Sequence, residues 1–204
     1  MTTPRANFRP AARGGFSLME MLVIMAIATM LITLAANGLR TTWRSQQIYT
    51  SATSLMQALS LARSNAMRFN CPTQLRIYRF QDGDITTAEP QYRAYQVVSV
   101  TPGASQDQFH IVTELQRLEG TTVMSKFSQY SSIVASDTPL PGDSMYSYVV
   151  VEFRPDGSTN LETNPSQPWT MTLLSDWGAD KQGPLPKDAR TLVIAPETGA
   201  VSLY

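Results

Sequence analysis

The sequence has few of the side chains that most often build catalytic and metal sites. Its 204 residues include one cysteine, Cys71, and one histidine, His110. These counts exclude a disulfide within the chain and a zinc site of two cysteines and two histidines. The sequence also contains no Gly-x-Ser-x-Gly motif, no phosphate-binding glycine loop and no histidine-rich metal motif. We therefore expect a protein that is not an enzyme and that needs no cofactor or metal.

The chain also has no net charge, because 16 basic and 16 acidic side chains cancel. This balance argues against a polycation that coats nucleic acid. The charges are unevenly placed, however. Residues 1–15 contain Arg5, Arg9 and Arg13 and no acidic side chain. Without this stretch the chain would be mildly acidic.

A long uncharged segment follows the basic start. Residues 21–39 are nearly all apolar, and none of them is charged. As a helix they would extend about 28 Å, close to the roughly 30 Å of hydrocarbon in a bilayer. Three interpretations are open. They are a secretory signal peptide cut near Ala35-Ala36, a plain single-pass anchor, and a prepilin-type leader cut between Gly15 and Phe16.

Glu20 distinguishes among these interpretations. An ionised carboxylate in hydrocarbon costs roughly 2.5–3.5 kcal/mol, and neither a signal peptide nor a plain anchor gains from it. A chain cut before Phe16 gains a new α-amino group close to Glu20, on its own or a neighbouring subunit. An ion pair at about 4 Å is worth about 4 kcal/mol at an effective dielectric constant of about 20. Because this offsets the cost and fixes the register of packed helices, the prepilin interpretation is favoured.

The hexapeptide at residues 15–20, Gly-Phe-Ser-Leu-Met-Glu, resembles the cleavage and methylation motif of type IV pilins and type II secretion pseudopilins. The resemblance implies that a prepilin peptidase cuts after Gly15, that Phe16 becomes the N-methylated first residue, and that Glu20 is the assembly carboxylate. It also implies other pilin subunits, bound through the N-terminal helix, and inner-membrane lipid as partners. Many relatives have a proline where this chain has Asn37 and a following glycine, so only some weakening of the helix is expected there.

A second helical pattern lies beyond the apolar run. Apolar residues recur there at alternating spacings of four and three, which places them on one face of an α-helix. They are Ile48, Ala52, Leu55, Leu59, Ala62, Ala66 and Phe69. Pro72 ends the pattern, because the residue before a proline avoids the helical conformation. The pattern predicts an amphipathic helix over residues 40–70 that packs on a head domain.

Residues 71–204 have the pattern of a β-rich head. Strands are predicted at 74–80, 92–100, 110–118, 121–127, 147–153, 169–174, 191–195 and 200–203. Because no helical periodicity separates them, the sheet should be mainly antiparallel. The stretches 135–144, 158–168 and 176–188 are predicted as loops. Gly157 should end a turn in which glycine admits a positive φ, and residues 196–199 should connect a terminal hairpin.

The layout of a helix followed by strands and a terminal Thr-Gly hairpin resembles the GspH/FimT-type minor pseudopilins, and residues 59–66 are similar to their helix end. A narrower resemblance is to the Verrucomicrobial pilin-like group called Verru_Chthon cassette protein D. It rests on residues 92–95, on the turn at residues 153–159 and on Thr198-Gly199.

These observations predict an α+β, pilin-like fold, with a long N-terminal helix packed on a mainly antiparallel head. The expected organisation is a leader (1–15), a transmembrane and assembly helix (16–39), an amphipathic helix (40–70) and a periplasmic head (71–204). We expect a structural subunit of the inner membrane, processed and assembled into a type II secretion or type IV pilus-like filament. The basic leader should keep the N-terminus cytoplasmic.

Two alternatives stay open. One is a secreted or anchored β domain with an ordinary signal sequence. The other is a DNA-binding uptake pilin of the FimT type, in which Arg63, Arg68, Arg76 and Arg79 would form a basic patch. Against it, Arg76 and Arg79 are three residues apart and should point to opposite faces of a strand. The last fourteen residues also contain no lysine or arginine.

Overall fold

The computed structural model describes residues 17–81, 89–103, 107–140, 143–163, 167–176 and 183–204, without the side chains of residues 34–40, 140 and 143–146. The chain forms two compact units, Met1–Thr41 and Thr42–Tyr204. Helix α1 (Leu18–Phe69) begins in the first unit and ends in the second.

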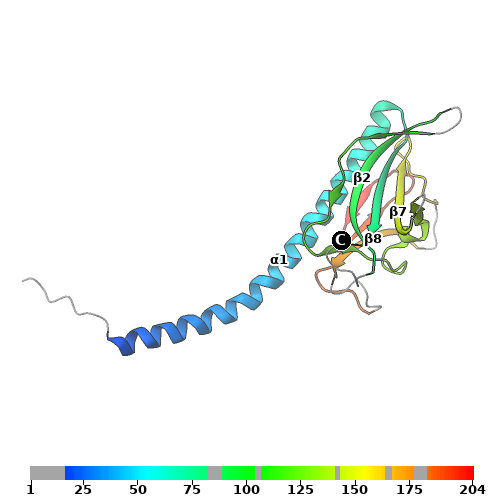
Figure 1. The fold of residues 1–204 in the computed structure, drawn as a ribbon. Coiled ribbons are helices and arrows are strands. Elements are labelled where there is room, and N and C mark those ends of the chain that lie inside the picture. The colour runs from blue at the N-terminus through cyan, green and yellow to red at the C-terminus, as the bar shows by residue number, and fades with distance from the viewer. Residues whose placement is uncertain (1–16, 82–88, 104–106, 141–142, 164–166, 177–182) are drawn as a thin grey trace, which may run out of the picture. The chain divides into compact units, whose positions relative to one another are not determined.

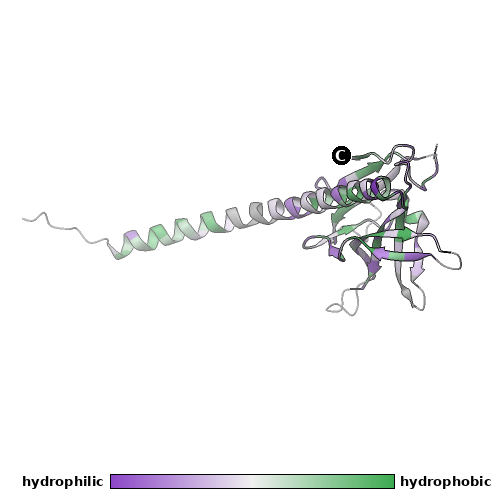
Figure 2. Ribbon diagram, turned by 90° about the horizontal axis from the view of Figure 1, so that it is seen from above, coloured by the Kyte–Doolittle hydropathy of each residue, from purple (hydrophilic) through white to green (hydrophobic). Residues whose placement is uncertain are grey.

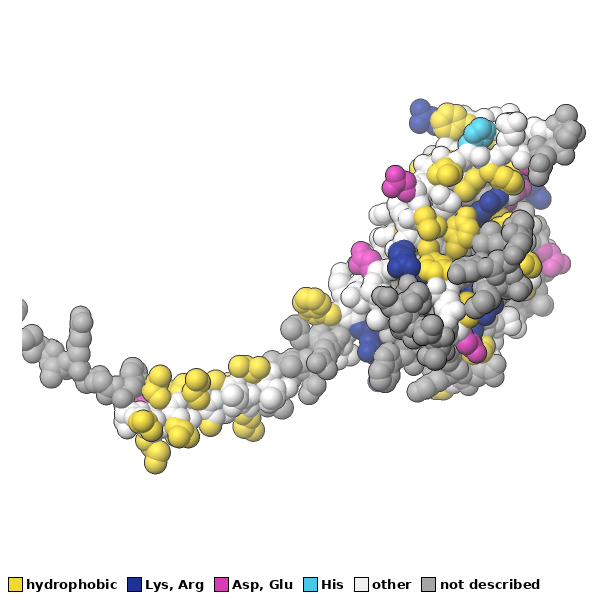
Figure 3. Space-filling model, viewed as in Figure 1, with side chains coloured by type: hydrophobic (Ala, Val, Ile, Leu, Met, Phe, Trp, Pro, Cys, Tyr) yellow, Lys and Arg dark blue, Asp and Glu magenta, His cyan; other side chains and the backbone are white. Residues whose placement is uncertain are grey.

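The first unit presents an apolar helical surface. The carbonyl oxygen of Ser17 accepts a hydrogen bond from the N–H of Met21, which starts α1. All leucine, isoleucine, valine and methionine side chains of residues 18–32 are exposed, and Figure 3 shows them along this part of the helix. The hydroxyls of Thr29 and Thr33 donate to carbonyl oxygens of the preceding turn. These polar groups therefore need no partner outside the helix.

Within the part of the chain that the structure describes, none of the helices has both the length and the apolar character needed to cross a membrane. The predicted membrane-spanning segment, 21–39, extends into residues 34–39, whose side chains lie outside the described ones. That segment stays a prediction. The backbone of α1 is helical through Asn37 and Gly38.

In the second unit, α1 is amphipathic, as predicted. Six members of the predicted apolar stripe, from Ile48 to Ala66, are 0–1% exposed. The seventh, Phe69, is 61% exposed, so its predicted burial is wrong. The helix ends at Phe69, and Asn70 adopts a positive φ of 49°. Figure 2 shows the mixture of hydrophobic and hydrophilic residues along this part of the helix.

The head contains one large sheet, in which every pairing between the described strands is antiparallel. Its main path is β10-β9-β8-β5-β2-β1-β7-β6, and β3 and β4 also pair with β2 (Figure 1). The strands are β1 (Thr73–Phe80), β2 (Gln91–Thr101), β3 (Gln108–Ile111), β4 (Gln116–Arg117), β5 (Thr122–Met124), β6 (Thr138–Leu140), β7 (Asp143–Phe153), β8 (Trp169–Ser175), β9 (Arg190–Ile194) and β10 (Val201–Leu203). The predicted antiparallel head is confirmed.

Two predictions about the strands are wrong. The segment predicted as one strand at 110–118 forms the separate strands β3 and β4, because the N–H groups of Val112 and Thr113 both bind the carbonyl oxygen of Val97. The segment predicted as a loop at 135–144 contains the end of the short 3₁₀ helix η1 (Ser132–Ser136), β6 and the start of β7. Its Pro139 is tolerated because β6 is the last strand of the sheet's main path, where a missing N–H costs least.

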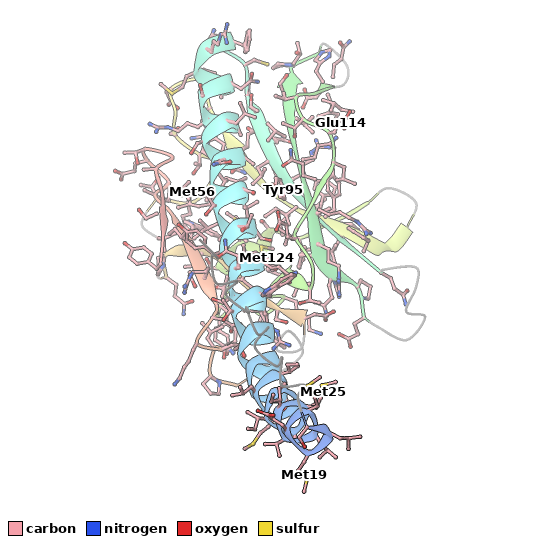
Figure 4. All side chains as sticks on the ribbon, turned by 90° about the vertical axis from the view of Figure 1, so that its left-hand side faces the viewer. Met19, Met25, Met56, Tyr95, Glu114 and Met124 are labelled. Carbon is pink, nitrogen blue, oxygen red and sulfur yellow. The ribbon has the colours of Figure 1, made fainter. Side chains whose placement is uncertain are left out.

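The main hydrophobic core lies between the stripe of α1 and one face of the sheet. Leu75 and Ile77 of β1, Val149 and Val151 of β7, and the stripe residues belong to one buried cluster. Figure 4 looks onto α1 with the sheet behind it, and its labelled Met56, Tyr95 and Met124 come from the elements that meet there. The predicted packing of the amphipathic helix on the head is confirmed.

Candidate functional site

The predicted processing site is only partly within the described residues. Gly15 and Phe16, on either side of the predicted cut, lie outside them. Glu20 is described, and it lies in the first turn of α1 with an exposed side chain. A carboxylate at a helix N-terminus is stabilised by the backbone N–H groups that have no partner there.

The surroundings of Glu20 are almost entirely apolar. Its neighbours Met19 and Met21 are 71% and 53% exposed. Leu22, Val23 and Ile24 are exposed as well. No described basic side chain forms an ion pair with Glu20. Covering this apolar surface would therefore remove water from the carboxylate, which is costly unless a cation or a proton neutralises it.

A second candidate surface lies on the face of the sheet that points away from α1. The guanidinium of Arg76 lies 4.3 Å from the ring centre of Phe109 and 5.2 Å from that of Tyr148. Its Nε and Nη2 donate to Oε1 of Gln74 at 3.0 and 2.8 Å. The Nε2 of Gln74 in turn donates to Glu152 at 2.7 Å. This arrangement, the Arg76 cluster, fixes the guanidinium close to two aromatic rings.

The Arg76 cluster has an exposed apolar border. Phe109 is 52% exposed and Ile111 is 70% exposed. Figure 3 shows hydrophobic side chains with lysine and arginine among them on the surface of the head. Exposed aromatic and arginine side chains are enriched where protein surfaces bind one another. Sequence reasoning missed this cluster, because Phe109 and Tyr148 lie 33 and 72 positions from Arg76.

The predicted separation of Arg76 and Arg79 is confirmed. Arg76 belongs to the outer face, whereas the guanidinium of Arg79 lies 6.0 Å from the ring centre of Tyr92, a core residue. The Nε of Arg79 donates to the carbonyl oxygen of Pro90 at 3.1 Å. The four arginines considered for a DNA-binding patch therefore do not form one surface.

Three polar side chains lie together where β2, β7 and the end of η1 meet. The hydroxyl of Tyr92 and Oδ1 of Asp137 are buried without a hydrogen-bond partner. Oδ2 of Asp137 accepts a hydrogen bond of 2.9 Å from Ser147. Burial, and then the nearby Asp137 carboxylate, raise the pKa of Tyr92. The phenol is thus held neutral and packs as part of the core.

Cys71 and His110, the single cysteine and the single histidine of the chain, lie at different places in the head. Cys71 is half-buried, and its thiol donates to the carbonyl oxygen of Val100 at 2.9 Å. His110 is exposed on β3. Within the described ranges, no three histidine, cysteine, aspartate or glutamate side chains are grouped as metal ligands would be.

No protein-family model matches this chain, and no curated protein matches it. Among solved structures, the type IV minor pilin FimU of Pseudomonas aeruginosa strain PAO1 is similar, with 12% sequence identity and a TM-score of 0.44. The similarity covers 78% of this chain and 89% of that chain. The narrower resemblance to Verru_Chthon cassette protein D finds no support in these comparisons.

Proposed function

We propose that this chain is a structural, non-enzymatic subunit of a type II secretion or type IV pilus-like filament, and that a prepilin peptidase processes it. The observation that carries the proposal is the hexapeptide at residues 15–20 directly before an uncharged apolar helix. The precursor spans the inner membrane once, with its N-terminus in the cytoplasm and its head in the periplasm. The peptidase cuts between Gly15 and Phe16, and Phe16 is then N-methylated.

Glu20 sets the position of the subunit among its neighbours. When lipid or other helices cover the apolar side chains around it, water no longer solvates the carboxylate. The α-amino group of Phe16, on the same or a neighbouring subunit, then supplies the counter-charge. Because only one axial offset between two helices brings these groups together, the ion pair selects that register. The roles of Gly15, Phe16 and Glu20 are passive, since other proteins act on them or bind them.

The exposed part of α1 supplies the attraction between subunits. Burial of apolar surface contributes about 25 cal/mol per Å², and every described large apolar side chain of residues 18–32 is available for it. Thr29 and Thr33 do not interrupt this surface, because their hydroxyls bind carbonyl oxygens within the helix. The head stays outside and offers its loops and exposed faces to neighbouring subunits.

Peptidase-dependent processing tests the proposal. The full chain is co-expressed with a prepilin peptidase, and the conversion of precursor to a shorter product is followed on a gel. Gly15→Leu should block the conversion, because the side chain stands next to the scissile bond, whereas the neighbouring Gly14→Leu serves as the matched control and should be processed. Failure of the unaltered chain to shorten with active peptidase present would contradict the proposal.

A further inference from the structure

A hollow of about 600 Å³ lies in the second unit, where the last turns of α1 face the connection between β9 and β10. Its helical wall carries Arg63, Ser64 and Arg68, and its other wall is the chain from Gly199 to Val201. The proposed function assigns no role to this place. We call it the Arg63 hollow.

Two tight turns shape the wall that faces the helix. Gly157 and Gly199 have positive φ values of 86° and 62°. A Cβ atom on Gly199 would lie 2.4 Å from the carbonyl oxygen of Gly157, so the two turns are in direct backbone contact. The N–H of Thr159 also donates to the carbonyl oxygen of Pro196 at 2.8 Å. The wall is therefore preformed and rigid.

Arg63 extends from the helical wall to the turn at Gly157, and one of its donors has no acceptor. Its Nε atom is buried and has no hydrogen-bond partner. A Cβ atom on Gly157 would lie 3.5 Å from Nε and 3.6 Å from Nη2 of Arg63, so the guanidinium packs directly against that turn. A buried charged donor without an acceptor is costly. The two Nη atoms of Arg63 form no hydrogen bond with a described residue and are not buried, so they are the donors that Arg63 offers to an oxygen atom in the hollow.

The positive charge of the hollow is not neutralised within the described part of the chain. Neither Arg63 nor Arg68 forms an ion pair with a described carboxylate. The guanidinium of Arg68 lies 5.2 Å from the ring centre of Phe69 and remains exposed. The acid of the neighbouring turn, Asp156, instead accepts hydrogen bonds from the N–H and hydroxyl of Ser158, which lower its pKa.

We propose that the Arg63 hollow binds an oxyanion, either a carboxylate or a phosphate group. A guanidinium presents its N–H donors in a planar fork that matches two oxygens of such a group. Arg63, Ser64 and Arg68 all offer their donors from the helical wall, opposite the chain from Gly199 to Val201. This site is independent of filament assembly, so either proposal can fail without the other.

Titration of the full chain in uncharged detergent micelles tests the site. Sodium phosphate and sodium acetate are each titrated by calorimetry against sodium chloride at matched ionic strength. We expect saturable binding of one phosphate or acetate per chain and none of chloride, and the preferred anion identifies the oxyanion class. The proposal would be overturned if neither oxyanion bound saturably, or if chloride bound equally well.

Three variants locate the binding. Arg63→Gln should lower the affinity for the preferred oxyanion at least about tenfold, as expected when a hydrogen bond to a charged group is lost. Arg68→Gln should also lower this affinity, and it should leave the core intact because Arg68 is exposed. Arg154→Gln removes the same charge from the neighbouring turn, outside the lining of the hollow, and should leave the affinity within about twofold. Equal losses from Arg68→Gln and Arg154→Gln would show a diffuse charge effect and overturn the site.

Discussion

Replacement of Leu59 by alanine tests how α1 is held in the head. Leu59 is 0% exposed and belongs to the main core cluster. Loss of a buried leucine side chain removes its transfer free energy and leaves a cavity, which together cost about 2–5 kcal/mol. Since small domains are stable by only about 5–15 kcal/mol, this single change should remove a large part of the free energy of unfolding.

Leu61 offers a matched control on the same helix. It is 44% exposed and lies two residues later, which places it on a different face. Leu61→Ala makes the same chemical change with the same small gain in helix propensity. It should therefore alter the free energy of unfolding by less than about 1 kcal/mol.

Guanidinium denaturation of the full chain in detergent micelles measures both variants. The fluorescence of the variants with Trp43 and Trp177 replaced by phenylalanine comes from Trp169 alone, which packs against the main core and so reports on the head. We expect a lower midpoint for Leu59→Ala and a midpoint near that of the unaltered chain for Leu61→Ala. Equal losses in the two variants would refute the assigned face of α1 and with it the packing of the helix on the sheet.

Three further predictions follow from other parts of the chain. Gly199→Ala should destabilise the head by at least about 1–2 kcal/mol, because Gly199 has a positive φ and lies close to Gly157. Gly183 has open space around it, so Gly183→Ala should leave the melting temperature nearly unchanged. Similar melting temperatures for the two variants in thermal denaturation would contradict the contact between Gly199 and Gly157. Glu20→Val should leave peptidase cleavage largely intact but reduce incorporation into cross-linked filaments, and normal incorporation would contradict the charge-pair mechanism. Burial raises the pKa of Tyr92, so the unfolded chain loses this proton first and the free energy of unfolding should fall as the pH rises above about 10. Tyr92→Phe should make that fall smaller in urea denaturation at alkaline pH, and an unchanged slope would show that Tyr92 does not cause it.

Local periodicity in the sequence predicted the helix and most strands. The apolar stripe of α1 was correct from Ile48 to Ala66, because residues of one helix face repeat at a spacing that the chain itself sets. Phe69 is exposed because a heptad pattern drifts by about 20° per repeat around a straight helix, and because the helix ends there. The turn at Gly157 was predicted correctly, since its positive φ is a local property.

Features that depend on distant pairings were not predictable from the sequence. The Arg76 cluster exists because β1 pairs with β7 and because β3 folds back on β2. The Arg63 hollow requires the end of α1 to meet the last hairpin of the chain. Strand β6 was predicted as a loop because Pro139 is a strand breaker in most positions, and only its place at the end of the sheet's main path makes it acceptable. Such juxtapositions follow from the fold, which no short motif encodes.

The mass of the mature N-terminus tests the proposed function most directly. The protein is purified from membranes of cells with an active prepilin peptidase, and its N-terminal peptide is analysed by tandem mass spectrometry. The account predicts that the polypeptide begins at Phe16 and carries one added methyl group on its α-amino nitrogen. A chain that still begins at Met1, or one that begins near Asn37, would contradict it.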